Sequence, residues 1–411
     1  MSPKSFIAAI AAILILATTV HAQSEEVASA DDTARFLAGM QPSAKSPLAQ
    51  LRQDWSVQEH ANRFDAAFGK LEDQQLAKIR EWSSANMRSP KPMMYYLFSG
   101  PDFLYANAFF PNASTYVLSG LEPVGQIPDL MKLPRSAIAQ TLRSIQVSLS
   151  SILSVSYFIT KNMREDLNNG PASGTLPILY VFLARSGKAI RDVSLVNLDE
   201  QGNLQSGDGV RAKSTARGVK IVFASGDEQI KTLYYFSTSV ADEPNGQYAL
   251  LKFCRQFSRG DSFLKSASYL LHRASFSQAR NFLLDQSAMI LQDDSGIPFA
   301  SFETGKWLLR PFGHYAGVLN IFQEHYQPKL TELYQRKQSN SIDFGIGYQS
   351  RFNQSNLLLA IRNPGAPDMT SLPPIDAVPR HFGLDKSVNL RKPRILVRSS
   401  RSENEDIGEI Y

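Results

Sequence analysis

The sequence predicts an α/β protein, in which a layered domain with a mixed sheet is flanked by helices, preceded by a helical segment and followed by a disordered charged tail. Segments with apolar residues at helical spacing alternate along the chain with short apolar runs bounded by Ser, Gly and Asp, which are typical of strands. Hydrophobic residues make up 43% of the chain, which is enough for a substantial core. We therefore expect one domain over residues 46–362, either α/β or mixed α+β.

The N-terminus has the pattern of a secretory signal peptide. Lys4 supplies a positive charge, residues 6–17 form a short apolar core, and a small-x-small cleavage site ends at Ala22. The apolar core is too short to span a bilayer comfortably, so cleavage is favoured over an uncleaved anchor. We expect a periplasmic or secreted protein with a signal peptide over residues 1–22 and a flexible leader over residues 23–45.

The first half of the predicted domain combines helices with two strands. Ser46 is a preferred N-cap residue and is followed by proline, and helical sequence continues to about residue 87, with an expected break near Gly69. The segments expected next are buried strands at residues 93–98 and 115–118 and a long helix with one apolar face that begins after Pro134.

The second half is expected to contain hairpins and further helices. Apolar runs separated by short Gly-containing turns favour antiparallel pairs of strands. Ser275 and Gln278 match a capping box at the start of one helix. The expected hairpins pair residues 178–184 with 193–198, 219–224 with 232–236, 299–302 with 307–312 and 342–348 with 357–361, and the expected helices cover residues 248–257, 262–272, 276–291 and 318–334, the last with a break at Pro328.

Residues 363–411 are predicted to be disordered because they are rich in proline and charge. Residues 386–401 are basic and contain no acid, and an acidic end follows them. The net charge of +5 is thus mainly a property of the tail, and we expect no nucleic-acid-binding fold. The tail itself is a candidate for binding an acidic surface or partner.

Two Ser-Gly turns mark the best candidate site. Ser99-Gly100 ends the first predicted strand and is followed by Asp102, and Ser119-Gly120 ends the second and is followed by Glu122. If the two strands are parallel, both turns lie at the carboxyl edge of the sheet, where α/β folds bind ligands. The two carboxylates could then serve acid/base chemistry or bind a polyol or a cation. The alternative is structural, with Asp102 as a helix cap and Glu122 in a solvated turn.

Other residues join this candidate site with less support. Tyr105 and Ser119 are candidate ligand contacts, and the dense aromatic residues around them could form a sugar-stacking platform, although core packing explains such residues more often. Ser99 is a further candidate catalytic residue. His314 follows a predicted strand and is a candidate general base, with a histidine bonded to the backbone as the alternative.

The motif search excludes several common classes of enzyme. The chain has no phosphate-binding loop, dinucleotide fingerprint, nucleophile elbow or H-E-x-x-H zinc motif. Asp199 starts a sequence that resembles a calcium loop, but its glycine is misplaced and no glutamate closes it. The single cysteine, Cys254, lies in an apolar run and is interpreted as a buried structural thiol. We therefore expect no cofactor and no metal.

The stretch from Tyr95 to Gly125, with its SGPDF…FFP…GLEPVG pattern, resembles a group of uncharacterised exported bacterial proteins. The segment from Gly296 to Pro328 is similar to the same group, so the resemblance covers most of the chain after residue 22. It implies export from a bacterial cell and no particular activity.

Three functions remain open from the sequence. The first is a non-catalytic exported protein that binds a small ligand or glycan or serves the cell envelope. The second is a hydrolase that uses Asp102 and Glu122 as an acid/base pair, with Ser99 or His314 as a possible partner. The third is an interaction protein that acts through its charged tail.

Overall fold

The computed structural model describes residues 28–157, 173–206, 216–226, 228–242, 248–336, 339–351 and 353–365. The predicted signal peptide and nearly all of the predicted tail lie outside the described residues. Among the residues described, no helix is both long enough and apolar enough to cross a membrane.

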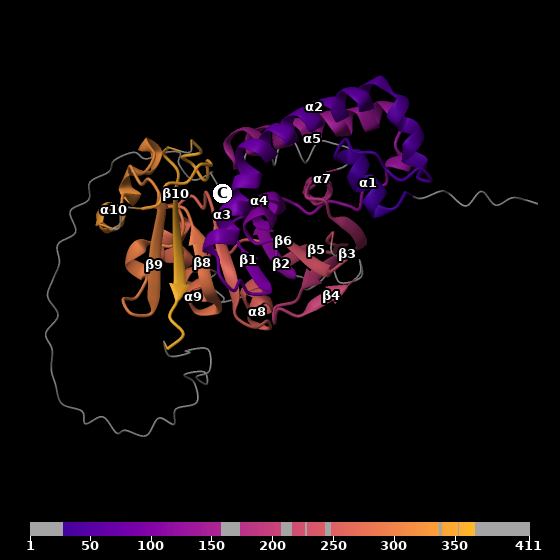
Figure 1. Cartoon of the computed structure of the whole chain (residues 1–411). Helices are drawn as coiled ribbons and strands as arrows, with labels where there is room; N and C mark the ends of the chain where they lie inside the picture. Colours follow the sequence, from indigo (N-terminus) through magenta and orange to yellow (C-terminus); the bar gives the residue numbers. More distant parts are fainter. Residues whose placement is uncertain are drawn as a thin grey trace, which may run out of the picture.

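A ten-stranded mixed sheet runs through the described part of the chain, in the order β4-β3-β5-β6-β2-β1-β7-β8-β10-β9 (Figure 1). This confirms the predicted α/β fold class. The strands are β1 (Met93–Tyr96), β2 (Thr115–Gly120), β3 (Ala189–Leu198), β4 (Leu204–Ser206), β5 (Ala216–Ala224), β6 (Ile230–Ser237), β7 (Gly260–Leu264), β8 (Ser287–Gln292), β9 (Trp307–Gly313) and β10 (Asn356–Arg362).

The centre of the sheet is parallel and its two flanks are antiparallel. Strands β6, β2, β1, β7 and β8 pair in parallel, whereas β5, β3 and β4 on one side and β10 and β9 on the other pair antiparallel. Helix α4 (Phe103–Phe109) connects β1 to β2, as the parallel pairing requires. The carboxyl ends of five neighbouring strands therefore meet at one edge of the sheet.

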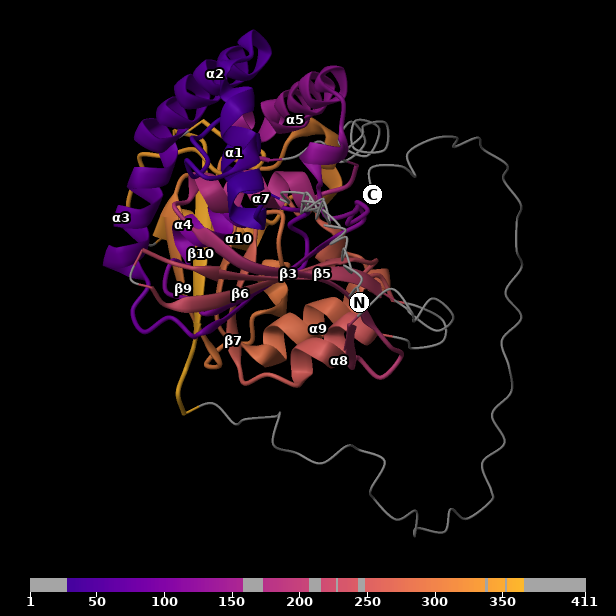
Figure 2. The same cartoon turned by 90° about the vertical axis from the view of Figure 1, so that its right-hand side faces the viewer.

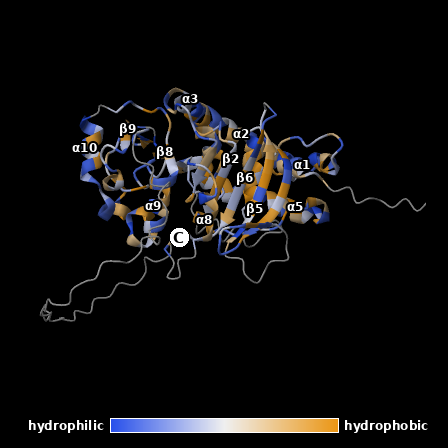
Figure 3. Cartoon of the chain, turned by 90° about the horizontal axis from the view of Figure 1, so that it is seen from below, coloured by the Kyte–Doolittle hydropathy of each residue, from blue (hydrophilic) through white to orange (hydrophobic). Residues whose placement is uncertain are grey.

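Helices cover both faces of the sheet (Figure 2). The alternation of side chains along β1 shows the two cores directly, since Met94 and Tyr96 belong to one core while Tyr95 and Leu97 belong to the other. One face packs against α1 (Ala30–Leu37), α2 (Trp55–Leu71), α3 (Ala77–Asn86), α4, α5 (Arg135–Val155) and α7 (Leu176–Arg185), and the other packs against α8 (Ala249–Arg255), α9 (Ser277–Gln286) and α10 (Pro328–Arg336). Helices at the surface, such as α2, carry both hydrophobic and hydrophilic residues, because one side of the helix packs against the core and the other faces solvent (Figure 3).

The N-terminal part departs from the sequence prediction. The expected flexible leader is wrong for residues 28–45, because Ser29 caps α1 by accepting a hydrogen bond from the Asp32 N–H, and Phe36 and Leu37 are fully buried. The expected break near Gly69 is also wrong. Gly69 lies inside α2, and the irregularity comes later, as a π-helical turn over Glu72–Leu76.

Apolar runs were the main source of wrong assignments in the second half. Residues 178–184 form helix α7 instead of a strand, because the run is buried on all sides and periodicity cannot separate a buried helix from a buried strand. The helix expected at 262–272 is strand β7 followed by a loop, and the helix expected at 276–291 is α9 followed by β8. Asp242 caps α9 in place of the predicted capping box, accepting from the Ser277 and Gln278 N–H groups.

Other predicted elements are confirmed. Strands β1 and β2, helix α5 after Pro134 and helix α8 lie close to their expected positions. Strands β5 and β6 form the expected antiparallel hairpin. The two hairpins expected near the C-terminus are wrong. Residues 299–302 and 342–348 form no strands, and β9 and β10, the second strands of the two expected hairpins, pair with each other.

Candidate functional site

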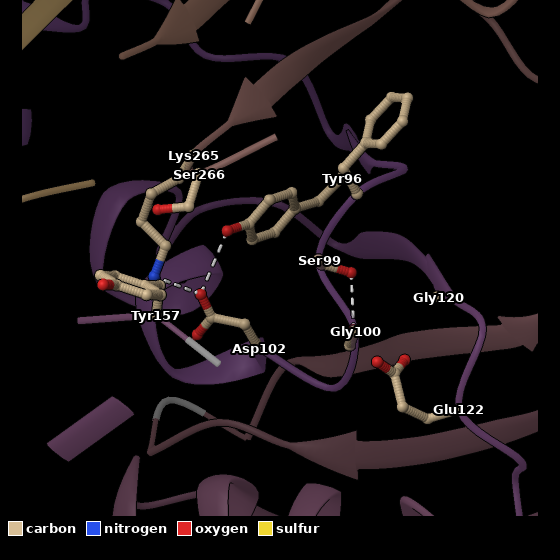
Figure 4. Close-up of a pocket in the computed structure, with 10 residues that line it drawn as sticks. Tyr96, Ser99, Gly100, Asp102, Gly120, Glu122, Tyr157, Lys265 and Ser266 are labelled. Carbon is tan, nitrogen blue, oxygen red and sulfur yellow. Dashed lines mark hydrogen bonds and ion pairs between the residues drawn. The ribbon is translucent and has the colours of Figure 1, made fainter. Parts of the chain in front are cut away.

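A pocket lies where β1, β2 and β7 end, and we call it the strand-end pocket (Figure 4). Its cavity volume is about 30 Å³, which is room for about two water molecules. Both Ser-Gly turns contribute to it, so the prediction that they share one edge of the sheet is confirmed. The lining residues are Tyr96, Phe98, Ser99, Gly100, Asp102, Gly120, Glu122, Tyr157, Lys265 and Ser266.

Asp102 forms a buried ion pair with Lys265. The Lys265 Nζ lies 2.7 Å from Asp102 Oδ2, and both side chains are only 2% exposed. The same oxygen accepts a hydrogen bond from the Tyr96 hydroxyl at 3.1 Å, while Oδ1 accepts from the Tyr105 N–H at 3.1 Å at the start of α4. Asp102 is therefore the helix cap that the sequence allowed as an alternative, and it also lines the pocket.

Lys265 is surrounded by groups that favour an ammonium. Besides Asp102, it donates to the Ser156 carbonyl, and its Nζ lies 3.8 Å from the centre of the Tyr105 ring. Burial lowers the pKa of Lys265, and the negative charge of Asp102 opposes that change. The sequence analysis missed Lys265 because it assigned residues 262–272 to a helix. The signal that could have found it is a polar Lys-Ser pair directly after an apolar strand.

Glu122 lies on the side of Asp102 away from Lys265 (Figure 4). It is only 2% exposed, so the alternative of a solvated turn is wrong. The Tyr235 hydroxyl donates to the Glu122 backbone carbonyl at 2.9 Å and lies 3.3 Å from Oε2. Burial and the nearby Glu122 charge raise the pKa of Tyr235 well above its ordinary value, so this hydroxyl stays a donor.

Gly120 is required by the close approach of the two turns. A Cβ at this position would lie 2.3 Å from Glu122 Oε2 and 2.8 Å from Gly100 Cα. We expect Gly120→Ala to destabilise the protein by about 1–3 kcal/mol, because the added methyl group overpacks the turns. Gly69→Ala is the matched control, since nothing lies within 4 Å of its added Cβ and alanine favours a helix. Urea unfolding would compare them, and equal midpoints for the two variants would contradict the prediction.

Of the other four predicted site residues, Ser99 lines the pocket, whereas Ser119, Tyr105 and His314 do not. Ser99 lines the pocket, but its hydroxyl donates to the Gly100 carbonyl at 2.7 Å, and Ser119 donates to the Leu97 carbonyl at 2.8 Å outside the lining. Tyr105 is fully buried and contacts Lys265 instead of the cavity. His314 is exposed and directly follows β9, which is the edge strand of the sheet. Because β8 and β10 separate β9 from β7, the structure does not bring His314 to the pocket.

Of the aromatic residues predicted to form a sugar-stacking platform, Tyr96 and Phe98 line the pocket, and others pack in the core. Tyr95, Phe103 and Phe109 are fully buried, and their rings pack in edge or tilted contacts with other core rings. Core packing, the alternative explanation, is therefore correct for this group. Cys254 is buried, as expected of a structural thiol.

A second buried acidic pair follows the next parallel strand. Asp293 and Asp294 come directly after β8 and are 2% and 5% exposed. Asp294 accepts from the Tyr269 hydroxyl and, at 2.9 Å, from Asn356 Nδ2. Neither aspartate lines the strand-end pocket, and within the described residues no group of three or more His, Cys, Asp or Glu side chains could hold a metal ion.

Comparison with known proteins gives no relative for this chain: no family model, no curated protein and no solved structure matches it.

Proposed function

We propose that this is an exported, non-catalytic protein that binds a small polar ligand in the strand-end pocket. The observation that carries the proposal is the convergence of buried polar side chains from three strand ends on one cavity at the carboxyl edge of parallel strands. That edge is the usual ligand site of α/β sheets. Export is supported by the signal-peptide pattern of residues 1–22.

The charges that line the pocket favour a neutral polyol or a small cation. Asp102 and Glu122 contribute two negative charges and Lys265 contributes one positive charge, which disfavours an anion. The cavity of about 30 Å³ favours a small ligand, of which one polar group enters the pocket, over a glycan chain.

The hydrogen bonds of Asp102 favour binding over catalysis. Both of its oxygens are already engaged by Tyr96, Tyr105 and Lys265. A general acid or base must reach the proton that it transfers. Asp102 is therefore suited to hold Lys265 and α4 in place. Glu122 lines the same cavity, and in this proposal it is the carboxylate that contacts the ligand.

Isothermal titration calorimetry with glycerol, erythritol, myo-inositol and putrescine tests the proposal on residues 23–411. We expect at least one probe to bind the wild type and Glu122→Gln to weaken that binding by about tenfold or more, since a hydrogen bond to a charged group contributes about 1.5–3 kcal/mol. Glu81→Gln, an exposed carboxylate on α3, is the control and should bind as the wild type does. No binding by the wild type, or equal binding by Glu122→Gln, would overturn the proposal.

A hydrolase is the second candidate, because Asp102 and Glu122 line the same cavity. In that case the wild type would cleave 4-nitrophenyl glycosides or esters, and both Asp102→Asn and Glu122→Gln would lose turnover while Glu81→Gln kept it. Absence of turnover in the wild type with these substrates would leave binding as the function.

A further inference from the structure

The Ser266 hydroxyl is a buried polar group at the strand-end pocket. Ser266 is the second residue after β7, and it lines the pocket. Its Oγ is buried and has no hydrogen-bond partner among the described residues. Figure 4 shows Ser266 on the same side of the pocket as Lys265, with Glu122 on the opposite side. A buried hydroxyl that lacks a partner is costly and rare in folded proteins, so this one needs an explanation.

The backbone of Ser266 is fixed from both sides. Its N–H donates to Asp293 Oδ2 at 2.8 Å, and its carbonyl accepts from the Tyr348 hydroxyl at 2.9 Å. Its φ of 53° lies in the left-handed region, where a residue other than glycine is strained and persists only because its surroundings hold it. The two hydrogen bonds therefore set the position of Ser266 at the pocket, and its hydroxyl takes no part in holding it there.

Neighbouring serines show that neither the strained backbone nor burial alone leaves a hydroxyl unpaired. Ser268 has a φ of 51°, close to that of Ser266, yet its Oγ lies 2.7 Å from the Tyr348 hydroxyl. Ser262 on β7 and Ser287 on β8 are buried, and their hydroxyls bond to each other at 2.6 Å. Ser266 lines the pocket and these three serines do not. The unpaired hydroxyl thus coincides with the cavity.

The surroundings of Ser266 favour binding over nucleophilic attack. A serine on a strained turn at the end of a strand is also found in a nucleophile elbow, where the N–H of the next residue stabilises the oxyanion. Here the Ala267 N–H donates to Ser295 Oγ at 2.7 Å, so it is already engaged. No base bonds to the Ser266 hydroxyl within the described part of the chain, and a nucleophilic serine needs one. The hydroxyl is therefore suited to contact a ligand without attacking it.

We propose that Ser266 contacts the ligand of the strand-end pocket through its hydroxyl and selects a polyol. This inference rests on the function proposed above and narrows its ligand from a polyol or a cation to a polyol. A ligand hydroxyl can accept from the Ser266 hydroxyl and donate to the Glu122 carboxylate, because a hydroxyl does both. An ammonium can only donate, and the positive charge of Lys265 lies on the Ser266 side of the pocket.

Urea unfolding of residues 23–411 first tests, without a ligand, whether the hydroxyl is unpaired. Ser266→Ala should have a midpoint equal to or above that of the wild type, because it removes a polar group that folding buries without a partner. Ser268→Ala is the matched control, a serine with nearly the same φ whose hydroxyl is bonded, and it should lower the midpoint. A midpoint of Ser266→Ala as low as that of Ser268→Ala would overturn the proposal, because the hydroxyl would then have a partner in the folded protein.

Isothermal titration calorimetry of the same variants with glycerol, erythritol, myo-inositol and putrescine then tests the contact. We expect Ser266→Ala to weaken polyol binding by about threefold to tenfold, as the loss of a hydrogen bond between neutral groups does. Ser268→Ala should bind as the wild type does, because Asp293 and Tyr348 still hold the Ser266 backbone. The two serines should therefore show opposite effects, with affinity lost in one variant and stability lost in the other.

The outcomes separate this inference from the proposed function. If a polyol binds and Glu122→Gln weakens it while Ser266→Ala does not, the proposed function stands and the role of Ser266 is overturned. Equal weakening by Ser266→Ala and Ser268→Ala would also overturn it, because the position of the backbone and not the hydroxyl would then matter. Binding of putrescine alone would overturn the selection of a polyol. Absence of binding by all four probes would overturn the proposed function and the ligand contact of Ser266 with it.

Discussion

Lys265→Met should destabilise the protein by about 3–5 kcal/mol, because it would leave Asp102 buried without its cation. The two groups are 2.7 Å apart and 2% exposed, so water cannot replace the lost partner. Urea unfolding would measure the loss. Lys132→Met is the matched control, since it breaks an exposed pair with Asp129 at 2.9 Å and should cost less than about 1 kcal/mol.

The double variant Lys265→Met with Asp102→Asn separates the pair from the packing of the lysine chain. The asparagine that replaces Asp102 is neutral, so the double variant should be more stable than the sum of the two single losses predicts, by about 1–3 kcal/mol. Strictly additive losses, or a Lys265→Met variant no less stable than Lys132→Met, would show that the pair does not link β7 to the start of α4.

The free energy of unfolding of Asp293→Asn, measured relative to that of the wild type, should increase by up to about 4 kcal/mol between pH 4 and pH 7. The folded wild type binds the Asp293 proton with a pKa of about 7, while the unfolded chain binds it with a pKa of 3.8. The folded state therefore holds the extra proton in this window, and its stability contribution is present below pH 4 and lost as the pH rises to 7. Asparagine has no charge to bury, so its curve lacks this loss.

The change with pH is the informative quantity here, since any hydrogen bond that asparagine fails to reproduce costs the same at every pH. Asp261→Asn gives a comparison, because burial raises the pKa of Asp261 only to about 6 and its pH effect should end about one unit lower. Chemical unfolding in steps of half a pH unit would show the pH range over which the stability of each variant changes relative to the wild type. Parallel curves for Asp293→Asn and the wild type would contradict the prediction.

Predictions from the sequence were most reliable for features that depend on neighbouring residues. The Ser-Gly turns at the strand ends and the alternative role of Asp102 as a helix cap both depend on residues close together in the chain, and both are confirmed. The connection between β1 and β2 is long enough for one crossover helix, so the sequence allowed parallel pairing, and the structure decided it.

Predictions failed where burial hides the pattern. Helix α7 is apolar all round, so its sequence carries no periodicity that distinguishes it from a strand. Strands β7 and β8 were assigned to helices for a related reason, since each is short, fully or mostly buried and adjacent to helical sequence. Because β7 was missed, Lys265 was missed with it.

The sequence by itself determined the fold class and the Ser-Gly turns that place Asp102 and Glu122 at strand ends, because turns depend on neighbouring residues. That β1 and β2 are parallel, so that both turns share one edge, was decided by the structure. Only the tertiary structure decided the partners of these carboxylates. Lys265 reaches Asp102, and Asp293 reaches the Ser266 N–H, through pairing of strands that are distant in sequence. Such pairing depends on the packing of the whole sheet, so it leaves no signal in any one segment of the chain.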